Sequence, residues 1–204
     1  MKHLGLVLVC VLLLAQGVAA GTIDGKASWA STGKRGQSQT QPRVVWLDSA
    51  RRFSVPKKIP TLAQRRSQFV PPLLIVVAGQ TVQMVNEDQI AHGVYSESSA
   101  KKFNLGYYAQ GMPRSVTFDR PGLVDVRCQL HSGMRGTILI VPTPYYAAVE
   151  TNGSFHIGNI PTGKYTLDFW SEGELSVSKE IWVPATGHVF VDINTTVQRT
   201  GPLK

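Results

Sequence analysis

Four side chains that carry sulfur or imidazole nitrogen are the residues best suited to chemistry in this sequence. Cys128, His131 and Met134 are separated from one another by two residues, and His92 lies upstream of them. A cysteine and two histidines around a metal, with a long axial bond to a methionine, form the ligand set of a type 1 (blue) copper site. Soft sulfur suits Cu(I), and imidazole suits both oxidation states. We therefore predict that these four residues bind one copper ion.

Other uses of these residues have less support in the sequence. One alternative is that Cys128 is a small buried hydrophobic residue with incidental histidines elsewhere. Zinc is disfavoured because Met is a poor zinc ligand and structural zinc takes four Cys or His ligands. A catalytic Cys–His pair needs an oxyanion hole and an orienting third residue, and no motif around Cys128 supplies them. We therefore predict no catalytic residues and no enzyme activity.

The elements that must position these ligands are predicted to be strands. Apolar segments after residue 20 are short, rich in β-branched and aromatic residues, and end at Gly, Pro or Asn. Their spacing predicts an all-β fold made of sandwiches, and only residues 62–69 are expected to form a helical turn or two. In this scheme Cys128 ends a strand, and His92 lies on a loop. The expected strands are residues 43–47, 73–77, 81–85, 114–118, 124–128, 137–141, 145–149, 154–157, 165–170, 175–183 and 188–193.

The Cys-x-x-His-x-x-Met loop resembles that of the cupredoxins, the blue-copper proteins that include plastocyanin, amicyanin and pseudoazurin. The resemblance covers residues 66–142 and implies a Greek-key copper-binding sandwich that transfers electrons. Gly93 departs from the pattern, because many cupredoxins have Asn directly after the first histidine ligand. That residue ties the two ligand loops together in the family, and such ties orient the ligands.

A longer resemblance is to secreted cupredoxin-like proteins that are often labelled methylamine utilisation proteins. It implies a copper-binding sandwich and does not establish a role in methylamine metabolism. The matching stretches are Phe69-Val-Pro71-Pro72-Leu73, Gly79 to Asp88, His92-Gly-Val94-Tyr95-Ser96, Phe118-Asp-Arg-Pro121-Gly122, Cys128 to Met134 and Thr143-Pro-Tyr145.

Residues 143–204 resemble a carboxypeptidase regulatory-like sandwich of the transthyretin type. The turn sequences Asn152-Gly153 and Thr162-Gly163 mark its hairpins. The strands that open such a sandwich are missing from this region. Residues 21–65, which contain N-terminal strands and a basic loop, supply them if the copper unit is inserted within the second sandwich. The competing interpretation assigns the N-terminal strand to the copper unit.

The first twenty residues have the layout of a secretory signal peptide. A short basic start precedes an eleven-residue apolar run, and small residues lie before a cleavage site near Ala20. The run is about half the roughly 20 residues that a transmembrane helix needs, although a retained anchor is the alternative. We therefore predict a periplasmic or secreted protein without a membrane span. Cleavage removes Cys10 and leaves Cys128 as the single cysteine.

The formal net charge of +8 comes from the N-terminal part of the chain. Residues 21–70 contain ten basic and two acidic residues. Nucleic acid is not expected as a partner, because the chain is exported and lacks a nucleic-acid-binding signature. Two interpretations stay open: a solvated loop, or a surface that docks on an acidic redox partner.

The sequence thus predicts an exported copper protein that transfers electrons. Two alternatives stay open: a copper-binding or copper-delivery protein without redox turnover, and an extracellular interaction module in which the metal is structural.

Overall fold

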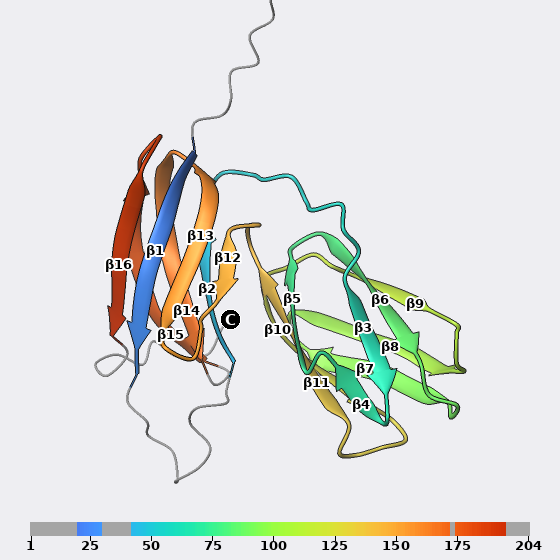
Figure 1. Ribbon diagram of the computed structural model, residues 1–204. Helices are drawn as coiled ribbons and strands as arrows, with labels where there is room; N and C mark the ends of the chain where they lie inside the picture. The colour runs from blue at the N-terminus through green and yellow to red at the C-terminus, as the bar shows by residue number, and fades with distance from the viewer. Residues whose placement is uncertain (1–19, 30–41, 172–173, 195–204) are drawn as a thin grey trace, which may run out of the picture.

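The computed structural model describes residues 20–29, 42–171 and 174–194. All the regular secondary structure within these residues is β-strand (Figure 1). The predicted all-β fold, with a cupredoxin-like sandwich and a second β-sandwich, is confirmed. Apart from Ala20, the predicted signal peptide lies outside the described residues. Within the described part of the chain, no helix is long and apolar enough to cross a membrane.

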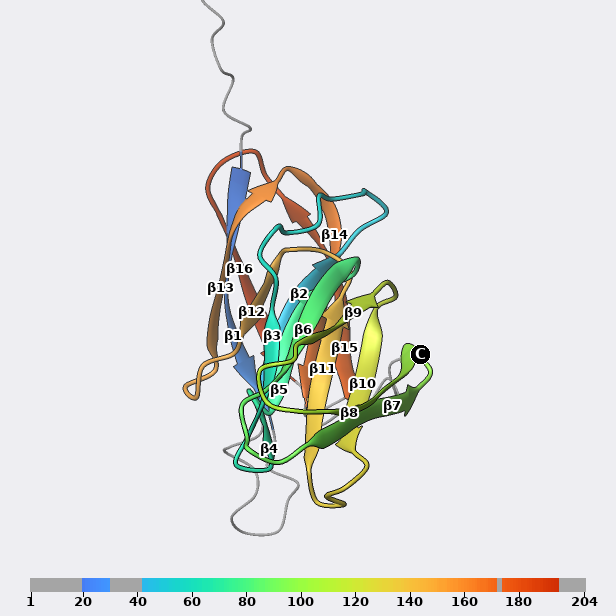
Figure 2. The same cartoon turned by 90° about the vertical axis from the view of Figure 1, so that its right-hand side faces the viewer.

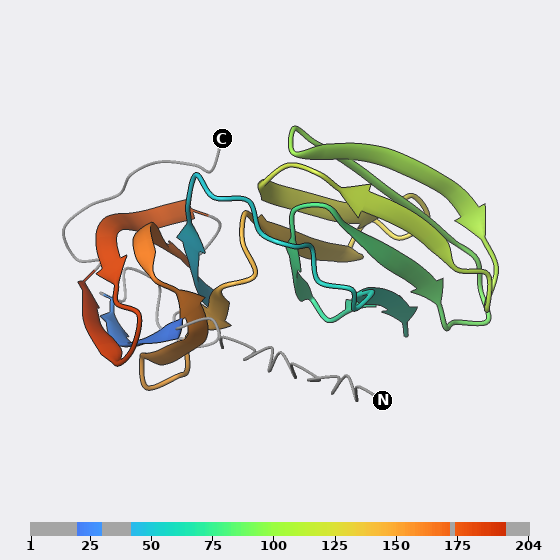
Figure 3. The same ribbon diagram turned by 90° about the horizontal axis from the view of Figure 1, so that it is seen from above.

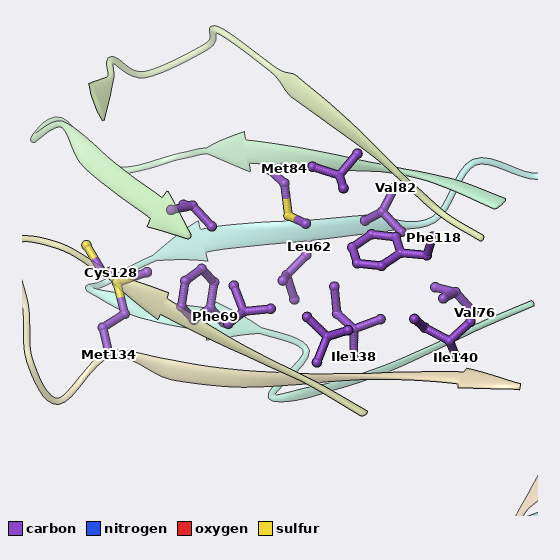
Figure 4. Close-up of a cluster of buried hydrophobic side chains, with 14 of the residues drawn as sticks. Leu62, Phe69, Val76, Val82, Met84, Phe118, Cys128, Met134, Ile138 and Ile140 are labelled. Atoms are coloured by element: carbon purple, nitrogen blue, oxygen red, sulfur yellow. The ribbon is translucent and has the colours of Figure 1, made fainter. Parts of the chain in front are cut away.

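Nine consecutive strands form the first sandwich. They are β3 (Thr61–Arg65), β4 (Gln68–Val70), β5 (Leu73–Val77), β6 (Gln80–Asn86), β7 (His92–Ser98), β8 (Lys101–Tyr108), β9 (Arg114–Phe118), β10 (Gly122–Cys128) and β11 (Arg135–Val141). One sheet has the order β5-β11-β10-β7-β8, and the facing sheet has the order β4-β3-β6-β9. Alternate residues of each strand point inward, as β6 shows, and Leu62, Met84, Phe118 and Ile138 fill the core between the sheets (Figure 4).

The second sandwich combines strands from both ends of the described chain. They are β1 (Ala20–Ser28), β2 (Arg43–Asp48), β12 (Tyr146–Ala148), β13 (Ser154–Pro161), β14 (Gly163–Ser171), β15 (Glu174–Val183) and β16 (His188–Asn194). One sheet has the order β13-β1-β16, and the other has the order β12-β2-β14-β15. Because β1 and β2 pair with C-terminal strands, the first sandwich is inserted between β2 and β12 (Figure 1).

Two local predictions need correction. Residues 62–69 form no helical turn; they lie in the hairpin β3–β4, whose turn residues Arg66 and Ser67 have positive φ. Strand β3 also pairs in parallel with β6, so the first sandwich starts at Thr61, before the predicted boundary at residue 66. The reason is that long-range pairing decides strand formation more than local sequence does.

The two sandwiches pack against each other through one face of each inner sheet (Figure 3). The contact is formed by residues of β2, β12 and β14 on one side and of β5, β10 and β11 on the other. On β2, Val45 and Leu47 face the core of the second sandwich, whereas Val44 and Trp46 face the first sandwich. There they contact a cluster that includes Leu139 of β11. Burial on both faces explains the unbroken apolar runs in these strands.

Candidate metal centre

Neighbouring strands of one sheet carry two of the predicted ligands. Cys128 is the last residue of β10, as predicted, and His92 is the first residue of β7. The prediction that His92 lies on a loop is therefore wrong. Strands β10 and β7 are antiparallel, with Cys128 opposite Val94, so the end of one meets the start of the other. His131 lies on the connection from β10 to β11.

The donor atoms of these three residues converge. Cys128 Sγ lies 3.6 Å from Nδ1 of His92 and 3.7 Å from Nδ1 of His131. All three donor atoms lie within 4.8 Å of one another. His92 and Cys128 are buried and His131 is half-buried, so the cluster lies at the edge of the core with one imidazole reaching toward solvent. The arrangement has the size and the N and S donors of a site for a soft or borderline metal ion.

Met134, the fourth predicted ligand, lies on the same connection between β10 and β11 as His131. Its amide N–H donates to the His131 carbonyl at 2.9 Å, and its own carbonyl accepts from the Cys128 N–H at 3.3 Å. These bonds close the ligand loop on itself. The Met134 side chain is buried in the same core as Cys128, and both lie at one end of it (Figure 4).

Asp88 holds the second nitrogen of His92. Its Oδ2 atom lies 2.8 Å from His92 Nε2. The same carboxylate accepts backbone N–H groups of Arg66 and Ser67, in the β3–β4 turn. When Nε2 donates its hydrogen to Asp88, Nδ1 presents a lone pair toward Cys128, which is the tautomer that a metal ligand needs.

The environment of Asp88 favours its charged form. Burial raises the pKa of Asp88, but hydrogen bonds from the Ser67 N–H, the His92 ring and the Arg66 N–H outweigh burial and hold the pKa below its ordinary value. Asp88 is not among the site residues predicted from the sequence. The sequence feature that could have identified Asp88 is its position four residues before the predicted ligand His92.

Asn86 fixes the segment that leads to His92. Its buried side-chain amide donates to the carbonyls of Ile90 and Tyr108 at 2.8 and 3.1 Å, and its Oδ1 accepts from the Asp88 N–H. A backbone bond of 2.8 Å from the Gln129 N–H to the Gly93 carbonyl ties the two ligand segments together.

Two exposed side chains, those of Gln129 and Tyr107, lie over Gly93. A Cβ atom there would lie 2.5 Å from Oε1 of Gln129 and 2.9 Å from the Tyr107 ring. A larger residue at position 93 would therefore require the Gln129 and Tyr107 side chains to shift.

No protein-family model matches this chain, and no curated protein matches it. Among solved structures, it is similar to a purple cupredoxin from Nitrosopumilus maritimus, with 19% identity and a TM-score of 0.37 over 40% of this chain and 99% of the other. Two reduced amicyanin variants are 21% and 22% identical, with TM-scores of 0.39 and 0.38, over 48% of this chain and 98% of each amicyanin.

Proposed function

We propose that this chain is an exported type 1 copper protein that transfers electrons. The observation that supports this proposal is the convergence of one cysteine sulfur and two histidine nitrogens, all within 4.8 Å, at the end of a β-sandwich core. His92, Cys128 and His131 would hold the copper ion, and Met134 is the fourth, weaker ligand. We also propose that the chain is one of the secreted cupredoxin-like proteins and that its second sandwich is of the carboxypeptidase regulatory-like type.

The donor set fits copper better than zinc. The neighbour at the fourth position is a thioether, which zinc binds poorly. Copper accepts a weak axial thioether. When bound, copper supplies a one-electron couple between Cu(II) and Cu(I).

The chain itself supplies rigidity. Cys128 and His92 lie on paired strands, Asp88 holds the His92 ring from behind, and the Met134 backbone closes the ligand loop. Ligands held from both sides stay in place when the charge of the site changes, and a site that does not rearrange exchanges electrons quickly.

The half-buried His131 ring offers a route for the electron to the surface. Leu130 precedes His131 directly, Ile90 lies two residues before His92, and these two residues are 53% and 50% exposed. In this proposal they form an apolar rim on which a redox partner docks, with His131 between the copper and that partner.

The proposal is tested by adding Cu(II) to the metal-free full chain and recording visible absorption and electron paramagnetic resonance. We expect one Cu(II) per chain and an intense band from thiolate-to-copper charge transfer. Cys128→Ser should remove the band, whereas Ser132→Ala, on the same loop, should keep it.

The outcome also separates electron transfer from copper delivery. Reversible voltammetry of the loaded chain supports electron transfer. Cu(II) binding without the intense band would contradict a type 1 site and favour the delivery function.

A further inference from the structure

A second group of metal-ligating side chains lies on the outer sheet of the second sandwich. Asp24 is on the central strand β1, His156 is on β13 and His188 is on β16. Asp24 is directly opposite His156, and His188 is opposite Thr22, which shares the face of β1 with Asp24. Strand pairing therefore brings together three residues that lie far apart in the sequence.

One carboxylate contacts both imidazoles. Asp24 Oδ1 lies 2.8 Å from His156 Nδ1, and Asp24 Oδ2 lies 2.6 Å from His188 Nδ1. These two hydrogen bonds hold the pKa of Asp24 below its ordinary value, and the bond with His156 has the larger effect. The carboxylate is thus charged and directed at two nitrogen atoms that can ligate a metal.

Phe190 and Gly158 lie beside the two rings. The Phe190 ring stacks on His188 with the ring centroids 6.2 Å apart and the planes at 17°. Gly158 lies beside His156, and a Cβ atom at that position would lie 3.3 Å from His156 Nε2. The absent side chain therefore leaves room for the imidazole along the strand.

The group is open to ions from solvent. The side chains of His156 and His188 are 65% and 58% exposed, and that of Asp24 is 31% exposed. The present Nδ1-to-oxygen contacts are hydrogen bonds, and the donor atoms of the three residues do not all lie within 4.8 Å of one another. An ion bound by all three therefore requires the two rings to rotate. Both rings are more than half exposed to solvent, which allows them to rotate.

We propose that Asp24, His156 and His188 bind one divalent transition-metal ion, of which Zn²⁺ is the representative. Two imidazoles and one carboxylate form a ligand set that zinc uses in open sites, where water completes the coordination. A metal-bound imidazole carries its one hydrogen on the other ring nitrogen, so each ring would keep its proton on Nε2 while Nδ1 binds the ion. Because metal ligands must be neutral imidazoles and a charged carboxylate, binding competes with protons and weakens as the pH falls.

This site is independent of the proposed copper centre. Sheet β13-β1-β16 is an outer layer of the second sandwich, whereas Cys128 and His92 belong to the first sandwich (Figure 1). Failure of one proposal therefore leaves the other untouched.

Calorimetric titration of the full chain with Zn²⁺ tests the proposal, in a Cys128→Ser, His131→Gln background that disables the first site. We expect one Zn²⁺ to bind. Asp24→Asn, His156→Gln and His188→Gln should each weaken that binding by more than about tenfold, since even residues behind the ligands change affinity by that factor. Asp192→Asn is the matched control, because Asp192 lies opposite Lys26 on the same sheet and its loss removes the same charge.

Proton resonances of the two imidazoles in the unsubstituted chain give a second readout that needs no variant. Both should shift as Zn²⁺ is added. The proposal is overturned if Zn²⁺ does not bind, or if it binds equally to the three variants and the control. It is also overturned if the imidazole resonances do not respond to Zn²⁺. In each case the group is an ion pair only.

Discussion

Asp88 and His92 form a pair in which the carboxylate Oδ2 lies 2.8 Å from the ring Nε2, while the opposite ring nitrogen faces Cys128 Sγ at 3.6 Å. The pair links the β3–β4 turn to the candidate metal centre, because the same carboxylate accepts the backbone N–H groups of that turn. A charged carboxylate behind a histidine ligand orients the ring and makes it a stronger donor.

The first prediction follows from this pair. Asp88→Asn should weaken Cu(II) binding by about 10- to 100-fold, because the amide neither carries the charge nor accepts all three hydrogen bonds. Loss of a negative charge near the metal should also raise the reduction potential. Competition with a chelator and voltammetry measure the two effects.

Asp125→Asn serves as the control for that variant. Asp125 pairs with Arg127 on the same sandwich and contacts none of the proposed ligands in the described structure. Equal copper affinity in the two variants would contradict the role of Asp88.

The second prediction ranks the ligands. Met134→Leu should keep copper and colour and shift the potential upward, because the thioether is the weak ligand that tunes the potential. The substitution conserves volume in the core, so it should cost less than about 1.5 kcal/mol of folding free energy. His92→Ala should weaken copper binding far more, and equal copper loss in both variants would refute the ranking.

The third prediction concerns docking. The pair Arg65 and Arg66 lies at the β3–β4 turn beside Asp88, whereas the segment that contains Arg51 and Arg52 lies at the opposite end of the molecule (Figure 2). Arg65 is engaged with Glu87 at 2.6 Å, which leaves the Arg66 side chain as the better candidate for contact with an acidic partner.

Arg66→Gln should therefore slow electron transfer to an acidic acceptor and reduce its dependence on salt, since opposite charges accelerate encounter and salt screens them. Arg52→Gln is the matched control and should change neither. Stopped-flow kinetics at several ionic strengths measure both. An unchanged salt slope in Arg66→Gln would leave the basic segment as a solvated surface.

The fourth prediction concerns pH and stability. Burial raises the pKa of Asp168 on β14, and repulsion from Asp48 adds to it, while hydrogen bonds from Ser178 and Trp46 lower it. An acid whose pKa is raised by folding contributes stability below its unfolded value of 3.8, and that contribution is lost as the pH rises through the raised folded value.

Asp168→Asn should therefore raise the urea midpoint at pH 7, and the gain should disappear below pH 3.8. Asp119→Asn, at an exposed carboxylate, is the control. A variant that is less stable than the parent at pH 7 would show that the charge of Asp168 is needed in the fold.

The sequence by itself determined the local features of this protein. Cys128, His131 and Met134 lie within one short loop, so their spacing was enough to predict a compact ligand loop after a strand. The alternating and continuous apolar runs were enough to predict most strands and the all-β class, because side-chain periodicity depends only on neighbouring residues.

Features that join distant segments were decided by the tertiary structure. The pairing of β10 with β7 brings His92 to Cys128, and the β3–β4 turn brings its N–H groups to Asp88. The pairing of β1 with β13 and β16 made one cluster of Asp24, His156 and His188. The physical reason is that strand pairing is a long-range contact whose partner and register are chosen by the packing of the whole core, and local sequence does not encode them.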